Sequence, residues 1–192
     1  MTALSYRFVD AVAFAIKAHG DQSRKGGTVP YVAHLLGVAS LVLEAGGDEE
    51  MAIAGLLHDT IEDTDTSAEE IAAAFGRRVA TIVEGCTDTD VMPKPPWRAR
   101  KERYIARLRA PETSTDVLVV SRADKLHNAR SLLQDYRNIG DELWSRFNEG
   151  PEQQLWYYRT LTDIFTQRIP GAMTDELRRV VDDLGAEVSR TR

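Results

Sequence analysis

A histidine and three carboxylates follow directly on an apolar run. The segment LLHDTIEDTD, residues 56–65, places His58 and Asp59 after two leucines, and Glu62 and Asp63 about one turn later. An imidazole beside a carboxylate is a donor set that suits divalent first-row transition metals. On one continuous helix, His58 is expected above Glu62 and Asp59 above Asp63, because residues four apart share a face. His58 and Asp59 are neighbours and can converge on one ion only if that ion lies at the helix end.

Further ligands for such an ion must come from distant segments. The chain has four histidines, and His34 lies on a predicted helix just after Pro30 and Tyr31. Asp124, in the segment SRADKLHN, lies on the apolar side of a long predicted helix. A carboxylate on an inner helix face needs a partner, because an isolated buried charge is costly. That partner is either a metal ion or a lysine or arginine, and a histidine on an apolar face is often only a hydrogen-bonded core residue. The order H…HD…D on three separate helices favours the metal.

The elements that must position these residues are helices. Apolar residues recur at helical spacing in most of the chain. The sequence therefore predicts helices over residues 1–20, 30–45, 51–63, 67–76, 77–87, 97–110, 113–136, 152–169 and 173–190. The run VLVV could be a buried strand, but no partner strand is visible, so a helix is preferred there. We expect one compact all-α domain over residues 1–192, in which residues 171–192 form a closing C-terminal helix.

The boundaries of these helices carry local signals. Gly46 and Gly47 are expected to end the second helix, and Asp48 to cap the third. Thr66 or Ser67 is expected to cap the next helix. Residues 88–96 contain three prolines and are predicted to be a loop, whereas residues 139–150 are a loop or a short helix.

Composition limits the class of protein. A hydrophobic content of 43% and a charged content of 28% are typical of a globular protein. The formal net charge of −6 argues against a nucleic-acid-binding surface. A single cysteine excludes an intrachain disulfide and fits a reducing compartment. The N-terminal segment has an amphipathic pattern rather than a signal-peptide core, and no apolar run is long enough for a membrane span. A cytoplasmic protein with no membrane partner is expected, and its oligomeric state is left open.

The order of the motifs resembles that of the HD-domain metal-dependent phosphohydrolases. The stretches RKGGTVPYVAH, LLHDTIEDT and ADKLHNARSL are similar to the hydrolase domain of the RelA/SpoT alarmone enzymes, and especially to the stand-alone small alarmone hydrolases. The resemblance covers about residues 10–165. It implies the all-α HD fold, which agrees with the helical periodicity read from the residues themselves.

The resemblance also implies roles for individual residues. The ligands of one divalent metal, typically Mn²⁺, would be His34, His58, Asp59 and Asp124. Glu62 and Asp63 match the catalytic carboxylate pair of the family. The substrate contacts that it implies are Arg24, Lys25 and Asn128. Independently of the resemblance, the basic run at residues 97–103 suggests Lys101 as a further phosphate contact, although such a run is often only a solvated helix face.

The activity implied is hydrolysis of the 3′-pyrophosphate of ppGpp or pppGpp, which would give GDP or GTP and pyrophosphate. A bound metal would acidify a water molecule, and Glu62 would orient or deprotonate that water. Two alternatives remain open. The first is an HD phosphohydrolase acting on another nucleotide, such as ppApp or the 2′-phosphate of NADPH. The second is a non-catalytic HD domain that binds a nucleotide.

Overall fold

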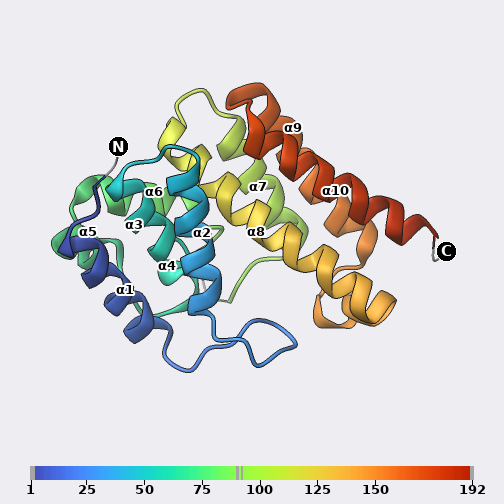
Figure 1. Ribbon diagram of the computed structural model, residues 1–192, viewed down its shortest axis with the longest axis horizontal. Helices are drawn as coiled ribbons and strands as arrows, with labels where there is room; N and C mark the ends of the chain where they lie inside the picture. Colours follow the sequence, from blue (N-terminus) through green and yellow to red (C-terminus); the bar gives the residue numbers. More distant parts are fainter. Residues whose placement is uncertain (1–2, 90, 92, 191–192) are drawn as a thin grey trace. The chain divides into compact units, whose positions relative to one another are not determined.

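The computed structural model describes residues 3–89, 91 and 93–190, and helices are the regular elements of this part of the chain (Figure 1). Apart from an isolated bridge between Ser23 and Pro30, these residues form no β-structure. The all-α prediction is therefore confirmed. The elements are α1 (Tyr6–His19), α2 (Val32–Glu44), α3 (Glu49–Leu57), α4 (Thr60–Asp63), α5 (Ala68–Phe75), α6 (Arg77–Cys86), α7 (Trp97–Arg109), α8 (Thr115–Ile139), the 3₁₀ helix η1 (Gly140–Arg146), α9 (Pro151–Arg168) and α10 (Ala172–Arg190).

The chain forms two compact units. The first consists of Met1–Lys94 and Glu112–Asp124, and the second consists of Pro95–Pro111 and Lys125–Arg192. Helix α8 begins in the first unit and continues into the second. The organisation of residues 1–192 as a single hydrolase domain stays a prediction.

Helix α3 forms the centre of the first unit. Residues 51–57 are all buried, and the helix packs against α1, α2 and α6. Gly55 permits the close approach of α2, because a Cβ atom at this position would lie 3.3 Å from the Cα of Ala39. The apolar run that precedes His58 therefore serves as a core element that fixes the start of the histidine–aspartate turn.

The predicted helix caps of the first unit are confirmed. The Asp48 side chain accepts a hydrogen bond from the Met51 amide at 3.0 Å and so caps α3. Ser67 and Glu70 form a reciprocal capping box at the start of α5. Gly46, with φ of 83°, follows the end of α2, in a conformation that glycine adopts readily.

The prediction of one helix over residues 51–63 is wrong. Helix α3 ends at Leu57, α4 begins at Thr60, and His58 and Asp59 lie in the turn between them. Asp59 has φ of −101° and ψ of −2°, and the Thr60 hydroxyl donates to the Leu57 carbonyl at 2.6 Å. This side-chain hydrogen bond competes with the helical backbone pattern, as hydroxyl side chains commonly do. His58 and Glu62 are consequently not stacked one turn apart on a continuous helix.

The second unit is built from α7, α9 and α10 together with the later part of α8. Helix α9 packs against α7 and lies beside α10 (Figure 1). Trp97 meets Trp156 and Tyr157 edge to face, with ring centroids 6.3 and 5.9 Å apart. The Arg168 guanidinium donates to two carbonyls at the end of α7, those of Leu108 and Ala110. None of the described helices combines the length and apolar character that a bilayer crossing requires.

Candidate metal centre

Two imidazoles and two carboxylates meet inside the first unit. His34 comes from the first turn of α2, His58 and Asp59 from the turn after α3, and Asp124 from α8. The Nε2 atoms of His34 and His58 are 3.3 Å apart. Asp59 Oδ2 lies 3.7 Å from the first of these nitrogens and 3.0 Å from the second. Asp124 Oδ1 lies 3.3 and 3.5 Å from the same two atoms.

These distances fit ligands that share one ion. Ligand bonds of about 2.0–2.2 Å place neighbouring ligand atoms about 3 Å apart. The donor atoms of His34, His58 and Asp59 all lie within 4.8 Å of one another, and Asp124 approaches both imidazoles. Imidazole nitrogen with carboxylate oxygen suits a first-row divalent metal. The cluster could therefore hold such an ion.

A hydrogen bond to the backbone orients the buried ring of His58. The side chains of His34 and His58 are 0% and 2% exposed. Nδ1 of His58 lies 2.9 Å from the Gly55 carbonyl, which can only accept, so Nδ1 carries the proton. In the neutral ring, Nε2 then presents its lone pair to the cluster. Histidines that bind a metal through one ring nitrogen usually donate a hydrogen bond from the other, as Nδ1 of His58 does here.

The electrostatics of the cluster favour a cation. Burial alone lowers the pKa of His58, but Asp59 and Asp124 together raise that pKa well above its ordinary value. Burial lowers the pKa of His34, only partly opposed by Asp124. Burial would raise the pKa of Asp59, yet the neighbouring His58 holds it below its usual range. Two ionised carboxylates thus attract a positive charge, which is either a proton on His58 or a metal ion.

The predicted catalytic pair follows this turn on α4. Glu62 is half-buried and accepts hydrogen bonds from Lys94 Nζ at 3.0 Å and from the Asp88 amide at 3.3 Å. Lys94 also lies 3.2 Å from Asp63 Oδ1. These contacts raise the pKa of Lys94 in spite of its partial burial. The sequence did not single out Lys94, because its reach to α4 depends on the path of a proline-rich loop.

Tyr31 is a second residue that sequence reasoning missed. Its hydroxyl donates to Asp59 Oδ2 at 2.6 Å, and its ring lies edge-on to the ring of His34. The only sequence signal was its place between Pro30 and the helix that carries His34.

The predicted substrate contacts fall in both units. Arg24 and Lys25 lie in the loop before α2, and the Arg24 amide donates to the Val29 carbonyl at 2.9 Å. Lys101 and Asn128 belong to the second unit, on α7 and α8. Lys101 Nζ lies 5.0 Å from the centroid of the Tyr157 ring there. Their roles toward a substrate stay predictions.

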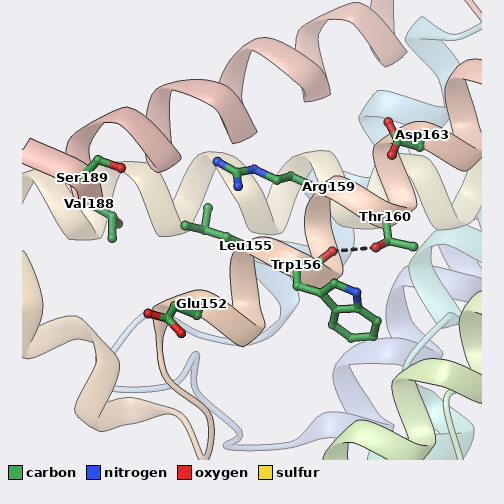
Figure 2. Close-up of a pocket in the computed structure, with 8 residues that line it drawn as sticks. All are labelled: Glu152, Leu155, Trp156, Arg159, Thr160, Asp163, Val188 and Ser189. Carbon is green, nitrogen blue, oxygen red and sulfur yellow. Dashed lines mark hydrogen bonds between the residues drawn. The ribbon is translucent and has the colours of Figure 1, made fainter.

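A separate hollow of about 410 Å³ lies between α9 and α10 of the second unit (Figure 2). None of the predicted site residues lines it. Its hydroxyl groups are already used within their own helices, since Thr160 donates to the Trp156 carbonyl and Ser189 to the Gly185 carbonyl.

Comparison with known proteins places these residues in a wider context. A family model described as "HD domain" matches residues 11–147. A probable guanosine-3′,5′-bis(diphosphate) 3′-pyrophosphohydrolase of Synechocystis is 39% identical over 156 residues, which are 81% of this chain and 19% of that protein. The guanosine-3′,5′-bis(diphosphate) 3′-pyrophosphohydrolase MESH1 of Danio rerio is 43% identical over 128 residues, which are 65% of this chain and 68% of that protein. This chain spans about a fifth of the length of the bacterial relatives that it matches.

Two solved structures have a similar fold. The structure titled "A metazoan ortholog of SpoT hydrolyzes ppGpp and plays a role in starvation responses" superposes with a TM-score of 0.78 at 27% identity, covering 96% of this chain and 99% of the other. A protein of Listeria monocytogenes EGD-e gives a TM-score of 0.69 at 32% identity, covering 78% of this chain and 96% of the other.

Proposed function

Because the chain belongs to the HD-domain family, we propose that it is a metal-dependent hydrolase that removes the 3′-pyrophosphate of ppGpp or pppGpp. Relatives named for this reaction cover most of the chain at about 40% identity, and one of the similar solved structures is titled for hydrolysis of ppGpp. The observation that carries the proposal is that the two imidazole nitrogens, from distant segments, lie 3.3 Å from each other and 3.0–3.7 Å from the carboxylate oxygens of Asp59 and Asp124. The products would be pyrophosphate and GDP or GTP.

The proposed ligands are His34, His58, Asp59 and Asp124, and the proposed ion is Mn²⁺. Mixed imidazole and carboxylate donors are compatible with Mn²⁺. When bound, such an ion acidifies a water molecule and offsets the negative charge of the phosphoryl oxygens.

The carboxylates on α4 supply the proton acceptor in this proposal. The oxygen of water forms a bond to the phosphorus attached to the ribose 3′-oxygen, the bond between that phosphorus and the 3′-oxygen breaks, and the 3′-oxygen leaves with a proton. Glu62 accepts one proton of the attacking water, the other stays with the released pyrophosphate, and a solvent water supplies the proton that the 3′-oxygen takes. Lys94 holds Glu62 and Asp63 in place and offsets their charge, as its distances of 3.0 and 3.2 Å to them support.

The phosphate groups of the substrate need local cations. The formal net charge of −6 opposes a polyanionic nucleotide at long range, so binding must depend on positive groups near the site. Arg24 and Lys25 on the loop before α2 are the proposed phosphate contacts, and Lys101 and Asn128 are proposed to contact the nucleotide. The single cysteine fits a reducing compartment, and the cytoplasm is the proposed location.

A panel of nucleotides tests the proposal. The Mn²⁺-loaded protein is incubated with ppGpp, ppApp and NADPH, and release of pyrophosphate or phosphate is followed with separation of the nucleotide products. Conversion of ppGpp to GDP and pyrophosphate is expected. Turnover of only ppApp or only NADPH would reject the proposed substrate and keep the hydrolase, whereas binding without turnover of any of them would reject the hydrolase.

A further inference from the structure

Tyr31 joins the proposed metal centre to the loop that precedes α2. Its hydroxyl donates to Asp59 Oδ2 at 2.6 Å, the same oxygen that lies 3.0 Å from Nε2 of His58. A short hydrogen bond to an ionised carboxylate is one of the stronger kinds in proteins. An ionised carboxylate oxygen can only accept a hydrogen bond, so the Tyr31 hydroxyl is the donor. The hydrogen bond from Tyr31 therefore constrains the orientation of the Asp59 carboxylate.

The ring of Tyr31 has contacts on the loop side. It stacks on the ring of His19, with centroids 4.9 Å apart and an angle of 22° between the planes. The Arg24 guanidinium carbon lies 5.8 Å from the Tyr31 ring centroid, within the range of cation–π attraction. The Tyr31 amide donates to the Gln22 carbonyl at 2.9 Å. Residues 22–31 thus form a loop that closes on Tyr31 at its base.

A second path runs from the same loop to α4. Gln22 Oε1 lies 2.9 Å from Nδ1 of His19, and Gln22 Nε2 donates to the Asp63 carbonyl at 2.9 Å. Because an amide oxygen can only accept, Nδ1 of His19 carries the proton. Nε2 of this buried ring then has no partner among the described residues. His19 therefore contacts the loop in two ways, by stacking on Tyr31 and by its hydrogen bond to Gln22.

We propose that Tyr31 is a positioning residue, whose hydroxyl holds Asp59 in the orientation that binds the ion and whose ring fixes the loop that carries Arg24 and Lys25. This inference rests on the proposed function for the identity of the ion site and of the nucleotide contacts. Metal affinity and nucleotide affinity are then both sensitive to one side chain, through separable parts of it. The hydroxyl acts on the metal, and the ring acts on the nucleotide.

Two substitutions separate these parts. Tyr31→Phe keeps the ring and removes the donor, so Mn²⁺ affinity, measured by competition with a chelator, is expected to fall about tenfold or more. At saturating Mn²⁺ its kcat is expected to recover, with KM for ppGpp unchanged. Tyr31→Leu also removes the stacked ring, and KM for ppGpp is expected to rise at saturating Mn²⁺.

Tyr136→Phe is the matched control. It removes a tyrosine–aspartate hydrogen bond of the same type, from Tyr136 to Asp141 at 3.0 Å, at a place that holds none of the proposed ligands. Its Mn²⁺ affinity is expected to equal that of the wild type.

Several results would overturn the proposal. Wild-type Mn²⁺ affinity in Tyr31→Phe rejects the role of the hydroxyl, and an unchanged KM in Tyr31→Leu rejects the role of the ring. If the variants do not fold, the wild-type chain labelled with 3-fluorotyrosine replaces them, with its resonances assigned by substitution of the other tyrosines. A Tyr31 resonance that does not respond to Mn²⁺ then rejects the proposal. If Tyr31→Phe loses Mn²⁺ affinity but the wild-type chain does not hydrolyse ppGpp, the role of the hydroxyl is supported and only the proposed substrate is rejected.

Discussion

His58 shows how much of the site is decided at a single residue. The Gly55 carbonyl fixes the proton on Nδ1, and the two neighbouring aspartates stabilise positive charge at Nε2. In the proposed metal centre, the same nitrogen is at neutral pH either protonated or bound to the ion. Competition between these two states governs how the site responds to pH.

Metal affinity is accordingly expected to rise with pH. The aspartates hold the pKa of His58 well above its ordinary value, so the ring is protonated in the metal-free protein at neutral pH and must lose its proton to bind an ion. The sign follows directly: below that raised pKa, affinity falls as pH falls, by about tenfold per pH unit for each proton released. Calorimetry of Mn²⁺ binding in buffers of different ionisation enthalpy measures the release. An affinity that is flat from pH 6 to 8 would contradict this assignment.

Glu62→Gln is expected to keep the metal and to lose turnover. The amide preserves the shape of the side chain but cannot accept a proton from water, and removing such a base typically lowers kcat by about 10²–10⁴-fold. Steady-state kinetics with ppGpp and elemental analysis of the same sample provide the two readouts. Glu69→Gln, at an exposed position on α5, is the control and should retain wild-type activity. Unchanged turnover in Glu62→Gln would remove Glu62 from the mechanism.

The residues that sequence reasoning found and missed differ in a physical way. The proposed ligands were found because residue type, scarcity of histidine and the order of motifs together point to them. Lys94 and Tyr31 were missed because lysine and tyrosine are common, and their contacts depend on how two loops run in space. A sequence pattern reports the periodicity of helices well, but it does not report where a loop places a side chain.

The turn between α3 and α4 places His58 and Asp59, and the helical pattern of the sequence did not predict it. The helical pattern from residue 51 to residue 63 has no glycine or proline after Gly55 to indicate a break. The interruption arises at His58 and Asp59, beside the Thr60 hydroxyl that takes the Leu57 carbonyl. Most other helices and caps followed from the sequence, because their apolar spacing and capping residues agree with the final packing.

The packing of α6 against α8 offers a test at this scale. A Cβ atom at Gly85 would lie 2.5 and 2.9 Å from the two methyl carbons of Val117, which is a stiff β-branched side chain near the start of α8. Overpacking of this kind costs about 1–3 kcal/mol, more than the gain of up to about 1 kcal/mol from replacing a helical glycine. Gly85→Ala is therefore expected to lower the free energy of unfolding.

Chemical denaturation of Gly85→Ala measures this effect, with Gly150→Ala as the control. A Cβ atom at Gly150 would meet nothing within 4 Å, so that variant has no clash. Because Gly150 is the N-cap of α9, where glycine is preferred to alanine, a loss of only about 0.5–1 kcal/mol is expected. Equal stability of the two variants would show that α6 and α8 are not packed as closely as the structure has them. Because α8 also carries Asp124, any loss of metal affinity in Gly85→Ala would show that this packing positions the ligand.

For the whole molecule, the net charge and the local arrangement of side chains have opposite effects on the binding of a nucleotide. The net charge of −6 disfavours a polyanion, while the helices bring the proposed metal ligands together and the loop before α2 carries Arg24 and Lys25. The fold class could be predicted from periodicity alone. The meeting of α2, α8 and the turn after α3 could be expected from the order of the histidine and aspartate motifs together with the family resemblance, because no local pattern encodes contacts between segments so far apart in the chain.

The metal content of the purified chain shows whether His34, His58, Asp59 and Asp124 together bind one ion. Wild type and Asp124→Asn are loaded with Mn²⁺, freed of excess by dialysis, and compared by elemental analysis, with circular dichroism as the check that both are folded. Asp124 is the informative position because it is the proposed ligand farthest along the chain from the histidine–aspartate pair. About one ion per wild-type chain and a large loss in the folded variant are expected. A folded Asp124→Asn chain that retains its full metal content, or a wild-type chain that binds none, would contradict this expectation.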